Sequence, residues 1–559
     1  MDNSSLADNF SLLSKLMDIN GENSFKTKTY SIAAYNIENL AVQLKDTPRE
    51  KLFSIKGVGD SIGQKVIEML DTGNLSILQD YIKMTPPGVI EMLNIKGIGP
   101  KKIHTIWKEM EIESVGELLY ACTENRLTRF KGFGEKTQQN VQEAIEYYFQ
   151  NQGSFLYAQI DEVFPQIDGY LKKLFPGNAN VTGAFRRQDL VIHELEYVIT
   201  ESNETIKPKM VSAQPPELLE ETTTTLVYKL RNGLKLRFHT GKKNMAEQLF
   251  LTTGSPVFLE AFKQQFATLK YESDGTEDEG IFKNAGIQYI PPFLRETPDI
   301  IAKAKDNKLP AVIQPGDVKS VIHSHSNWSD GVSSVEEMAR ECINKGFEYL
   351  VMSDHSKAAA YARGLSEERI LEQHHYIDEL NGRMGGFKIF KSIECDILTD
   401  GSMDYTNEVL ASFDLVIASI HSNLKMTEEK AMARVLKAIS NPYVTILGHM
   451  TGRLLLSRKG YPLDHRKIID ACADNDVVIE LNAHPRRLDI DWQWIDYAIQ
   501  KNVLLSIDPD AHSLEGFNDI KYGVLAAQKG GLTMQQNLSS FSLKEFESFL
   551  AKRKSKKKI

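Results

Sequence analysis

The stretch IHSHSNWSDG at residues 322–331 decides how the second half of the chain is interpreted. Its two histidines, His323 and His325, lie two residues apart, which places both imidazoles on one face of an extended segment. Asp330 follows in the same stretch. Imidazole and carboxylate side chains at a strand end are typical ligands of a divalent cation. The stretch therefore indicates a metal site.

Further along, six apolar segments alternate with helical stretches, and each segment ends in polar residues. The segments read EYLVMSDH, FKIFKSIECDI, DLVIASIHS, VTILGHM, VVIELNAH and VLLSIDPDAH. This alternation predicts a largely parallel sheet over residues 320–550, open or closed into a barrel. In such folds the carboxyl ends of the strands build the active site. Nine side chains are expected to meet there: His323, His325, Asp330, His355, Glu394, His421, His449, Asp510 and His512.

A metal centre explains these nine side chains better than packing does. A single histidine at a strand end is more often packed or hydrogen-bonded than a ligand. Nine polar side chains on successive buried strands are harder to explain that way, because each unpaired buried polar group costs about 1–3 kcal/mol. The four cysteines form no CxxC pair, which argues against a thiolate zinc site. We expect two or three ions, and Zn²⁺, Mn²⁺ and Fe²⁺ all suit these ligands.

Residues 1–150 have apolar side chains at three- and four-residue spacing, which predicts a helical region. Within it, FSIKGVGDSIGQKVIEML (53–70), LNIKGIGPKKIHTIWKEM (93–110) and TRFKGFGEKTQQNVQEAI (128–145) repeat one pattern. The pattern resembles the helix-hairpin-helix motif, which grips a DNA backbone without reading bases. A Gly-x-Gly that merely ends a helix is the alternative. The expected DNA-contacting residues are Lys56, Gly57, Gly59, Lys96, Gly97, Gly99, Lys131, Gly132 and Gly134.

Residues 151–316 are expected to form a mixed α/β region. TTTTLVYKLRNGLKLRFHT (222–240) has two β-rich runs around Asn232-Gly233, a strong hairpin signal. Two prolines and a glycine in 304–319 place the next boundary there. The basic tail at 551–559, AKRKSKKKI, is expected to be disordered.

Composition is that of an ordinary globular protein, with 42% hydrophobic and 25% charged residues and a net charge of −9. The bulk charge does not announce a nucleic-acid binder, so local patches must carry any DNA contact. No apolar run reaches the ~18 residues of a membrane span, and the start of the chain lacks the pattern of a signal peptide. We therefore expect a cytoplasmic protein, a monomer without membrane contact.

Several motifs carry a family resemblance that extends through nearly the whole chain. They are IHSHSNWSDG, SDHSKAAAYARGL, ECDILTDGSMDY, ASIHS, GHMTGRLLLSR, ELNAHPRRLDI and DPDAH. Residues 320–550 resemble the polymerase-and-histidinol-phosphatase (PHP) domain, a distorted β/α barrel. The domain order resembles the bacterial family X DNA polymerases that carry PHP at the C-terminus.

The resemblance implies a trinuclear centre in this region. It assigns His323, His325, Glu394 and Asp510 to one ion, Glu394, His421 and His449 to a second, and Asp330, His355 and His512 to a third. Glu394, Asp510 and Arg453 are the expected catalytic residues. The basic side chains Lys357, Arg363, Arg453 and Arg487 are expected near the mouth of the site, where they hold flanking phosphates or form structural ion pairs.

Residues 151–316 resemble the nucleotidyltransferase palm and thumb of family X, but with a degenerate polymerase site. VTGAFRRQDLVIHELEYVI (181–199) matches a segment that normally reads Gly-Ser-x-Arg-Arg and then Asp-x-Asp. Mg²⁺ demands near-ideal octahedral geometry, so longer or missing carboxylates disable the site. The residues of this predicted degenerate site are Gly183, Arg187, Glu194, Glu196, Leu236 in place of the third aspartate, and Thr253, Gly254 and Ser255 of the TTGS turn.

These features together predict a DNA-repair-type hydrolase that acts on gapped or primer–template DNA as a 3′–5′ exonuclease or 3′-end phosphoesterase, with polymerase activity lost. Three alternatives stay open: an active gap-filling polymerase with an exonuclease, a small-molecule phosphatase, and a non-catalytic DNA-binding scaffold.

Overall fold

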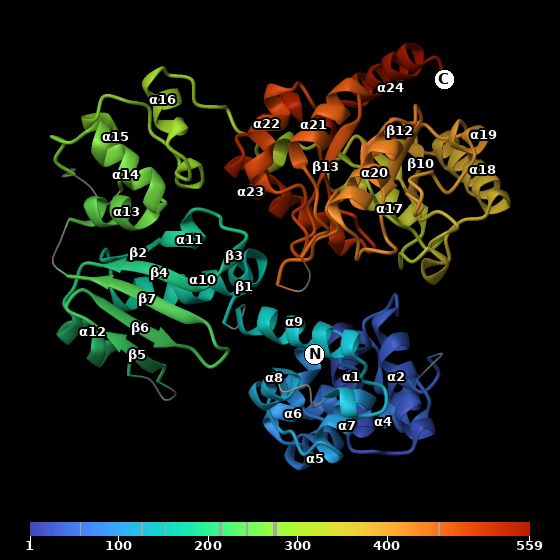
Figure 1. Ribbon diagram of the computed structural model, residues 1–559, viewed down its shortest axis with the longest axis horizontal. Helices are drawn as coiled ribbons and strands as arrows, with labels where there is room; N and C mark the ends of the chain where they lie inside the picture. The colour runs from blue at the N-terminus through green and yellow to red at the C-terminus, as the bar shows by residue number, and fades with distance from the viewer. Residues whose placement is uncertain are drawn as a thin grey trace. The chain divides into compact units, whose positions relative to one another are not determined.

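The computed structural model describes residues 1–55, 58–123, 127–150, 153–211, 215–241, 244–271, 277–456 and 459–559. The chain divides into two compact units, Met1–Gln152 and Gly153–Ile559 (Figure 1). Among the described residues, no helix is both long and apolar enough to cross a membrane.

The first unit is helical, as the sequence predicts. Its α-helices are α1 (Asn3–Ile19), α2 (Ser24–Glu38), α3 (Arg49–Leu52), α4 (Asp60–Thr72), α5 (Ser76–Met84), α6 (Pro87–Glu91), α7 (Pro100–Lys108), α8 (Val115–Thr123) and α9 (Glu135–Gln150). In each repeated motif the second glycine immediately precedes a helix, α4, α7 or α9. The apolar residue between the glycines, Val58, Ile98 or Phe133, is buried. This anchor holds each turn against the helical core.

The second unit begins with a five-stranded mixed sheet in the order β2-β4-β7-β6-β5. The elements of this region are β1 (Phe155–Leu156), α10 (Tyr157–Leu174), β2 (Ala179–Thr182), α11 (Gly183–Arg186), β3 (Val191–Ile192), β4 (Glu194–Ile199), α12 (Asn203–Lys209), β5 (Glu217–Glu221), β6 (Thr225–Lys229) and β7 (Lys235–Thr240), and β1 and β3 form a separate two-stranded sheet. The hairpin predicted around Asn232-Gly233 is confirmed, since β6 and β7 pair antiparallel with Lys229 opposite Lys235.

A small helical region follows the sheet and buries a cluster of phenylalanines, among them Phe250, Phe258, Phe262 and Phe282. Its helices are α13 (Met245–Thr253), α14 (Pro256–Gln265), α15 (Glu279–Asn284) and α16 (Asp299–Lys305). Asp278, at the start of α15, is fully buried against the equally buried Arg295, with 2.5 Å from the carboxylate to Nη1. Arg186 of α11 donates to the same carboxylate at 2.8 Å. These charges join the helical region to the sheet.

The Asp278 cluster makes stability depend on acid. Burial by itself raises the pKa of Asp278, but the guanidiniums of Arg295 and Arg186 outweigh it and lower the pKa to about 2. A depressed carboxyl pKa stabilises the fold above the unfolded value near 4, and this contribution is lost as pH falls from about 4 to 2. We expect Asp278→Asn to lower the free energy of unfolding by about 3 kcal/mol at neutral pH and to reduce the loss of stability between pH 4 and pH 2. Urea unfolding between pH 2 and 7 measures both effects, and a variant that loses as much stability in this pH range as the parent would contradict them.

The C-terminal region is a parallel barrel with the strand order β14-β13-β12-β11-β10-β9-β8. The strands are β8 (Ser320–Val321), β9 (Tyr349–Met352), β10 (Lys388–Asp396), β11 (Leu415–Ser419), β12 (Val444–Leu447), β13 (Val478–Asn482) and β14 (Leu505–Asp508). All six apolar segments picked out in the sequence form strands. A backbone bridge between Ser324 and Ala511 joins the segments that follow β8 and β14, so the barrel is nearly closed.

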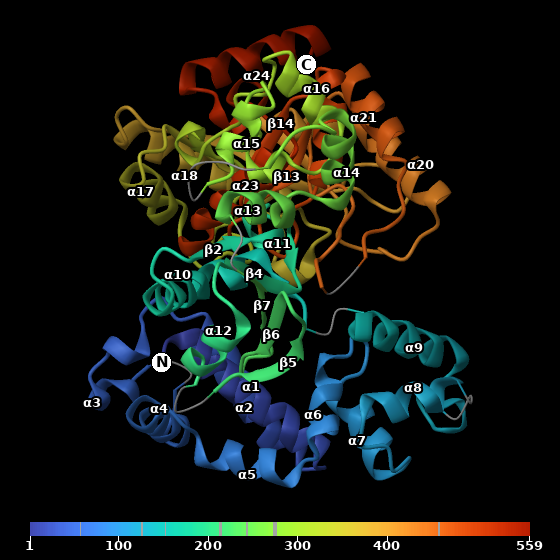
Figure 2. The ribbon, with the colours of Figure 1, turned by 90° about the vertical axis from the view of Figure 1, so that its left-hand side faces the viewer.

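Helices cover the outside of the barrel. They are α17 (Val335–Asn344), α18 (Glu367–Arg383), α19 (Asn407–Leu410), α20 (Glu428–Ile439), α21 (His465–Asp474), α22 (Ile495–Gln500) and α23 (Ile520–Lys529). The last helix, α24 (Leu543–Lys557), packs against the interior cluster instead. Helix α23 lies beside β13 and β14 (Figure 2). Because the interior is packed with side chains such as Tyr349, Phe390 and Ile417, the polar ligands are confined to the strand ends.

The predicted disorder of the basic tail is wrong. Helix α24 runs from Leu543 to Lys557 and starts with a capping box formed by Ser542 and Glu545. Phe546 and Leu550 enter the interior cluster of the barrel. The buried Arg553 guanidinium donates to the backbone carbonyls of Val444 and Asp476. Apolar anchors and a buried arginine thus order a segment whose composition alone suggests a solvated tail.

Candidate metal centre

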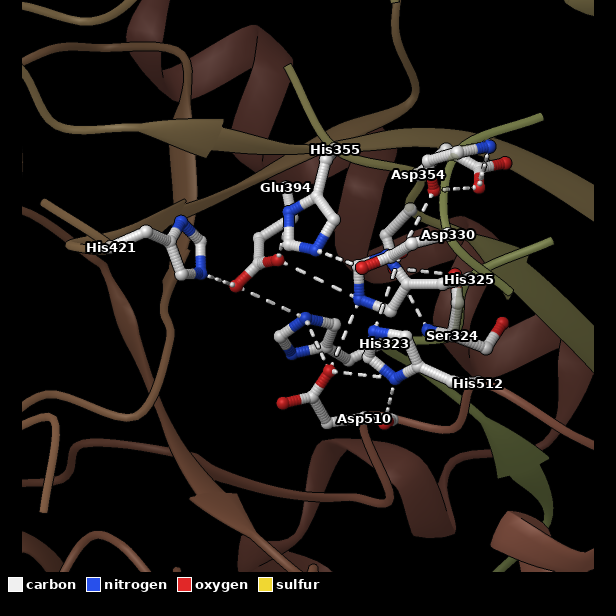
Figure 3. Close-up of polar contacts among 12 residues, drawn as sticks. His323, Ser324, His325, Asp330, Asp354, His355, Glu394, His421, Asp510 and His512 are labelled. Carbon is white, nitrogen blue, oxygen red and sulfur yellow. Dashed lines mark hydrogen bonds and ion pairs between the residues drawn. The ribbon is translucent and has the colours of Figure 1, made fainter. Parts of the chain in front are cut away.

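All nine predicted ligands come from the carboxyl ends of the barrel strands. The segment after β8 supplies His323, His325 and Asp330, β9 is followed by His355, β10 carries Glu394, β11 and β12 are followed by His421 and His449, and β14 is followed by Asp510 and His512. Figure 3 labels these side chains, except His449, and shows them turned toward one another around Glu394 and Asp510. The parallel topology brings together ligands that lie almost 190 residues apart in the chain, since the same strand ends meet at one edge.

Glu394 lies at the centre of the cluster and is completely buried. The imidazole nitrogens within reach of its carboxylate are His355 Nδ1 at 2.9 Å, His449 Nε2 at 2.9 Å, His421 Nε2 at 3.1 Å, His323 Nε2 at 3.3 Å and His325 Nε2 at 3.6 Å. Five imidazoles thus lie around the two oxygens of Glu394, and its role as a ligand shared by two ions stays a prediction.

The side chains form three overlapping groups that suit metal ions. The groups are His325, Asp330, His355 and His512; His323, His325 and Asp510; and His355, Glu394 and His421. They differ from the predicted sets in that His325 and His355 each belong to two groups, whereas Glu394 belongs to one group instead of the predicted two. His449 lies outside these groups but contacts Glu394 directly. The structure therefore brings all nine predicted ligands together and leaves their partition among ions as a prediction.

Distances within the cluster fit bound cations. His325 Nδ1 lies 4.0 Å from Asp330 Oδ1, too far for a hydrogen bond. An ion with ligand bonds of about 2.0–2.2 Å spans such a gap. The buried Nδ1 of His325 has no hydrogen-bond partner among the described residues. Since an unpaired buried nitrogen is costly, the donor set fits divalent ions better than it fits an empty polar core.

Electrostatics point the same way. Burial lowers the pKa of His355, but Glu394 and Asp330 outweigh it and raise the pKa to about 10. The pKa of His421 is raised to about 9, because Glu394 and Asp396 overcome the effect of burial. Burial itself raises the pKa of Glu394, yet the surrounding imidazoles hold it well below its usual range. The carboxylates therefore favour positive charge at the centre of the cluster.

Three of the imidazoles are oriented by an oxygen that contacts their Nδ1 atom. Asp396 Oδ1 lies 3.2 Å from His421 Nδ1, and the carbonyl of Asp510 lies 2.9 Å from His512 Nδ1. Glu480 Oε2 lies 2.5 Å from His323 Nδ1. In each case the other ring nitrogen, Nε2, lies near a carboxylate of the cluster. Partners of this kind set the tautomer of metal-binding histidines.

Two buried acids next to the cluster, Glu480 and Asp354, were not among the residues predicted from the sequence. Glu480 lies within the apolar run VVIELN, and a charged residue inside a buried strand is the signal that was available. Asp354 is buried and accepts hydrogen bonds from the backbone N–H groups of Ser326 and Ser329. It thereby shapes the loop that carries Asp330.

The structure does not place Arg453 at the reacting centre. Its guanidinium donates to the carbonyls of Arg487 and Leu488 and pairs with Asp491. These contacts engage three of the five N–H donors of the guanidinium with acceptors outside the nine ligands, and its catalytic role stays a prediction.

Two of the other basic side chains expected near the mouth of the site also form contacts with neighbouring protein groups. Lys357 pairs with Glu367 at 2.5 Å, and Arg363 donates to the carbonyl of Ser329. Arg487 faces the cluster instead, with Nε 3.6 Å from Asp510 Oδ2.

The polymerase-like sheet holds a different set of charges. Glu194 of β4 pairs with Arg237 of β7, and Glu196 accepts from His239 Nε2 at 2.9 Å. Gly183, with φ of 64°, lies so close that a Cβ there would come within 2.0 Å of Glu196 Oε1. The two glutamates thus contact an arginine and a histidine of the neighbouring strand.

The prediction that Leu236 occupies the third acid position is wrong. Glu194 is in register with Lys235 and Glu196 with Arg237. Since side chains alternate along a strand, Leu236 points to the opposite face, where it is buried in the core. Lys235 and Arg237 therefore share the face of the glutamates, and β7 supplies no carboxylate there.

The remaining residues of the predicted polymerase site form an internal network. Arg187 donates to the carbonyl of Thr253 at 2.9 Å and pairs with Asp189 at 2.6 Å and with Glu296 at 3.1 Å. Gly254 ends α13, and Ser255 caps α14 with its side chain.

The helix-hairpin-helix residues have the exposure expected of a DNA-contacting surface. Lys96 and Lys131 are exposed, as are the glycines that follow them, Gly97, Gly99, Gly132 and Gly134. Gly97 and Gly132 have φ values of 87° and 91°, which glycine adopts at low cost. Gly59 caps α4 in an extended conformation. The predicted contacts Lys56 and Gly57 lie outside the described residues.

Tandem helical hairpins joined to a barrel with a histidine and carboxylate cluster define a class of multidomain, DNA-binding and metal-binding enzymes. Sequence profiles agree: a helix-hairpin-helix domain matches residues 1–75, a SAM-like helix-hairpin-helix tandem matches residues 89–146, and a PHP domain matches residues 322–484. The chain is 31% identical over 559 residues to a Bacillus subtilis protein named DNA polymerase/3'-5' exonuclease PolX, with 96% of each chain covered. The chain therefore belongs to the bacterial family X DNA polymerases with a C-terminal PHP domain.

Other relatives match a smaller part of the chain. A probable phosphatase of Acetivibrio thermocellus is 30% identical over 177 residues, which cover 30% of this chain and 67% of that protein. A probable phosphatase of Escherichia coli is 25% identical over 165 residues, which cover 29% and 59%.

Proposed function

We propose that the protein is a metal-dependent phosphoesterase that shortens DNA from the 3′ end, and that its polymerase-like region no longer synthesises DNA. The observation that carries the proposal is the convergence of nine imidazole and carboxylate side chains, Glu394 among them, at one end of the barrel. Exposed hairpins in the first unit supply DNA backbone contacts. The relative named as a DNA polymerase and 3′–5′ exonuclease supports DNA as the substrate.

In this proposal the residues of the chain prepare the site for hydrolysis. The nine side chains would hold divalent ions, which would supply Lewis acidity and make water a better nucleophile for phosphoester hydrolysis. Glu394 and Asp510 hold the cluster together by bridging imidazoles from different strands. Zn²⁺, Mn²⁺ and Fe²⁺ are all compatible with the donor set, and the proposed number of ions is three.

The polymerase-like region serves as a DNA-positioning module in this proposal. Two Mg²⁺ held about 3.5–4 Å apart support nucleotidyl transfer. Here Arg237 and His239 contact the two glutamates, so the carboxylates that would have to bind metal ions are engaged by protein side chains.

A gapped primer–template assay tests the proposal directly. A labelled primer incubated with Mn²⁺ is expected to shorten with the parent protein and with His375→Ala, an exposed histidine on α18. The same primer is expected to stay intact with His449→Ala, whose ring contacts Glu394 at 2.9 Å. Shortening that persists in His449→Ala would refute the proposed site.

Adding nucleotides to the same assay separates the alternatives. The proposal predicts no extension of the primer. Extension would support the alternative hypothesis of an active gap-filling polymerase. The matches to probable phosphatases favour small-molecule hydrolysis as the second candidate. Turnover of a mononucleotide phosphate faster than DNA would support that candidate and overturn the proposed substrate.

Arg487 is the basic side chain best placed to hold the substrate phosphate. Its single described ion pair is the 3.6 Å contact with Asp510. A guanidinium bonded to phosphate contributes about 1.5–3 kcal/mol. We expect Arg487→Ala to lower kcat/KM on DNA by about 10- to 100-fold, with the exposed Arg340→Ala as control. Steady-state kinetics measure the change, and equal kcat/KM in the two variants would count against this role.

A further inference from the structure

A charged residue in the interior of the barrel has no place in the proposed ligand set. Glu480 lies in β13, the strand Val478–Asn482, and is completely buried. Its neighbours in the strand, Ile479 and Leu481, are buried apolar side chains. A buried carboxylate is costly unless its oxygens are paired, so its partners reveal what it does.

Both oxygens of Glu480 are engaged with residues of the candidate metal centre. Oε2 lies 2.5 Å from His323 Nδ1. Oε1 accepts the backbone N–H of His449 at 3.0 Å and the side-chain amide of Asn482 at 2.9 Å. The same amide of Asn482 donates to Asp510 Oδ2 at 3.0 Å. Glu480 thus connects, directly or through Asn482, with ligands that follow β8, β12 and β14.

The contact with His323 sets the tautomer of that ring. A carboxylate oxygen accepts hydrogen bonds, so the 2.5 Å contact favours the tautomer with the proton on His323 Nδ1. The other nitrogen, Nε2, lies 3.3 Å from Glu394 Oε1 and 3.4 Å from Asp510 Oδ1. A neutral ring protonated at Nδ1 presents a free lone pair at Nε2, where a cation shared with these carboxylates would bind.

We propose that Glu480 is a positioning residue of the metal centre: it fixes the tautomer of His323 and ties the strand ends of β8 and β12 to each other. The inference rests on the proposed function, because it assumes that the nine ligands bind divalent ions. Glu480 itself does not reach the reacting atoms, since its two oxygens are occupied by His323, His449 and Asn482. It acts through them.

Asp396 provides an internal comparison. It contacts His421 Nδ1 at 3.2 Å, so a second imidazole of the cluster has a carboxylate behind it. Glu480 differs because it also accepts the backbone N–H of His449, a ligand from another strand. Loss of Glu480 is therefore expected to disturb two ligands at once, whereas loss of Asp396 disturbs one.

Metal content provides a test that does not depend on activity. Full-length parent, Glu480→Ala, Glu480→Gln and the exposed control Glu372→Gln are loaded with Mn²⁺ or Zn²⁺, dialysed against graded chelator and analysed for bound metal per chain. We expect Glu480→Ala to weaken metal retention by about 10- to 100-fold. Glu480→Gln keeps the shape and an acceptor oxygen, so a smaller loss is expected.

A second readout separates positioning from simple structural support. ¹⁵N NMR of labelled histidine in the metal-loaded parent is expected to show a protonated Nδ1 for His323 that is altered in Glu480→Gln. A merely structural role would lower the unfolding midpoint of the metal-free protein and leave metal affinity and this signal unchanged, and that result overturns the inference. If Glu480→Ala does not fold, Glu480→Gln decides by the same measurements. A parent protein that retains no metal would instead overturn the proposed function.

Discussion

Glu394→Gln is expected to abolish hydrolysis, with a loss of at least about 10³-fold in rate, because each 1.4 kcal/mol of lost stabilisation costs a factor of ten and metal ions supply several kcal/mol. The Glu394 carboxylate lies 2.9–3.6 Å from five imidazole nitrogens. Its replacement by a neutral amide removes the negative charge that these five groups share. The amide also introduces an N–H₂ group that opposes both protonated imidazoles and cations.

The measurement is the rate of primer shortening at saturating Mn²⁺, together with bound metal per chain. Glu372→Gln makes the same chemical change on the exposed face of α18 and is expected to behave as the parent does. A Glu394→Gln protein that keeps both its metal and more than about a tenth of the parent rate would show that Glu394 does not bridge the centre.

The ligand set was predictable from sequence because parallel β/α topology places polar strand ends together whatever their separation in the chain. The apolar segments identified the strands, and the first polar residues after them identified His355, His421 and His449. What the pattern does not encode is which ring nitrogen points inward. That depends on contacts such as the one between Asp396 and His421, which only the folded structure shows.

Two predictions, for Leu236 and for the basic tail, were wrong for the same reason: both positions depend on contacts between segments that are distant in the chain. Leu236 was placed at the third acid position by counting along the chain, and a shift of one residue in a strand moves a side chain to the opposite face. Pairing with β4 gives the register and places Lys235 and Arg237 on the glutamate face. In the same way, composition described the basic tail of the chain correctly, but tertiary contacts of Arg553 and Leu550 decide that it is helical.

The second large effect is expected at Lys529, the last residue of α23. Its ammonium group is fully buried and donates to the carbonyl of Arg187 at 2.8 Å, to Asp189 at 2.8 Å and to Glu296 at 2.6 Å. Arg187 pairs with the same two carboxylates. Two cations and two anions therefore form one balanced network between the barrel, the five-stranded sheet and the Phe-rich helical region. Arg187, which was predicted at the polymerase site, belongs to this ion-pair network.

Lys529→Met is expected to destabilise the second unit by about 3 kcal/mol, because it leaves two carboxylates facing one cation in a largely buried site. The double variant Lys529→Met with Glu296→Gln removes one charge of each sign and leaves the Arg187 and Asp189 pair balanced. It is expected to recover most of the loss, which is the signature of coupled residues. Urea unfolding of the full chain, followed by tryptophan fluorescence, measures both. Additive losses in the double variant would mean that the four groups do not act as one network.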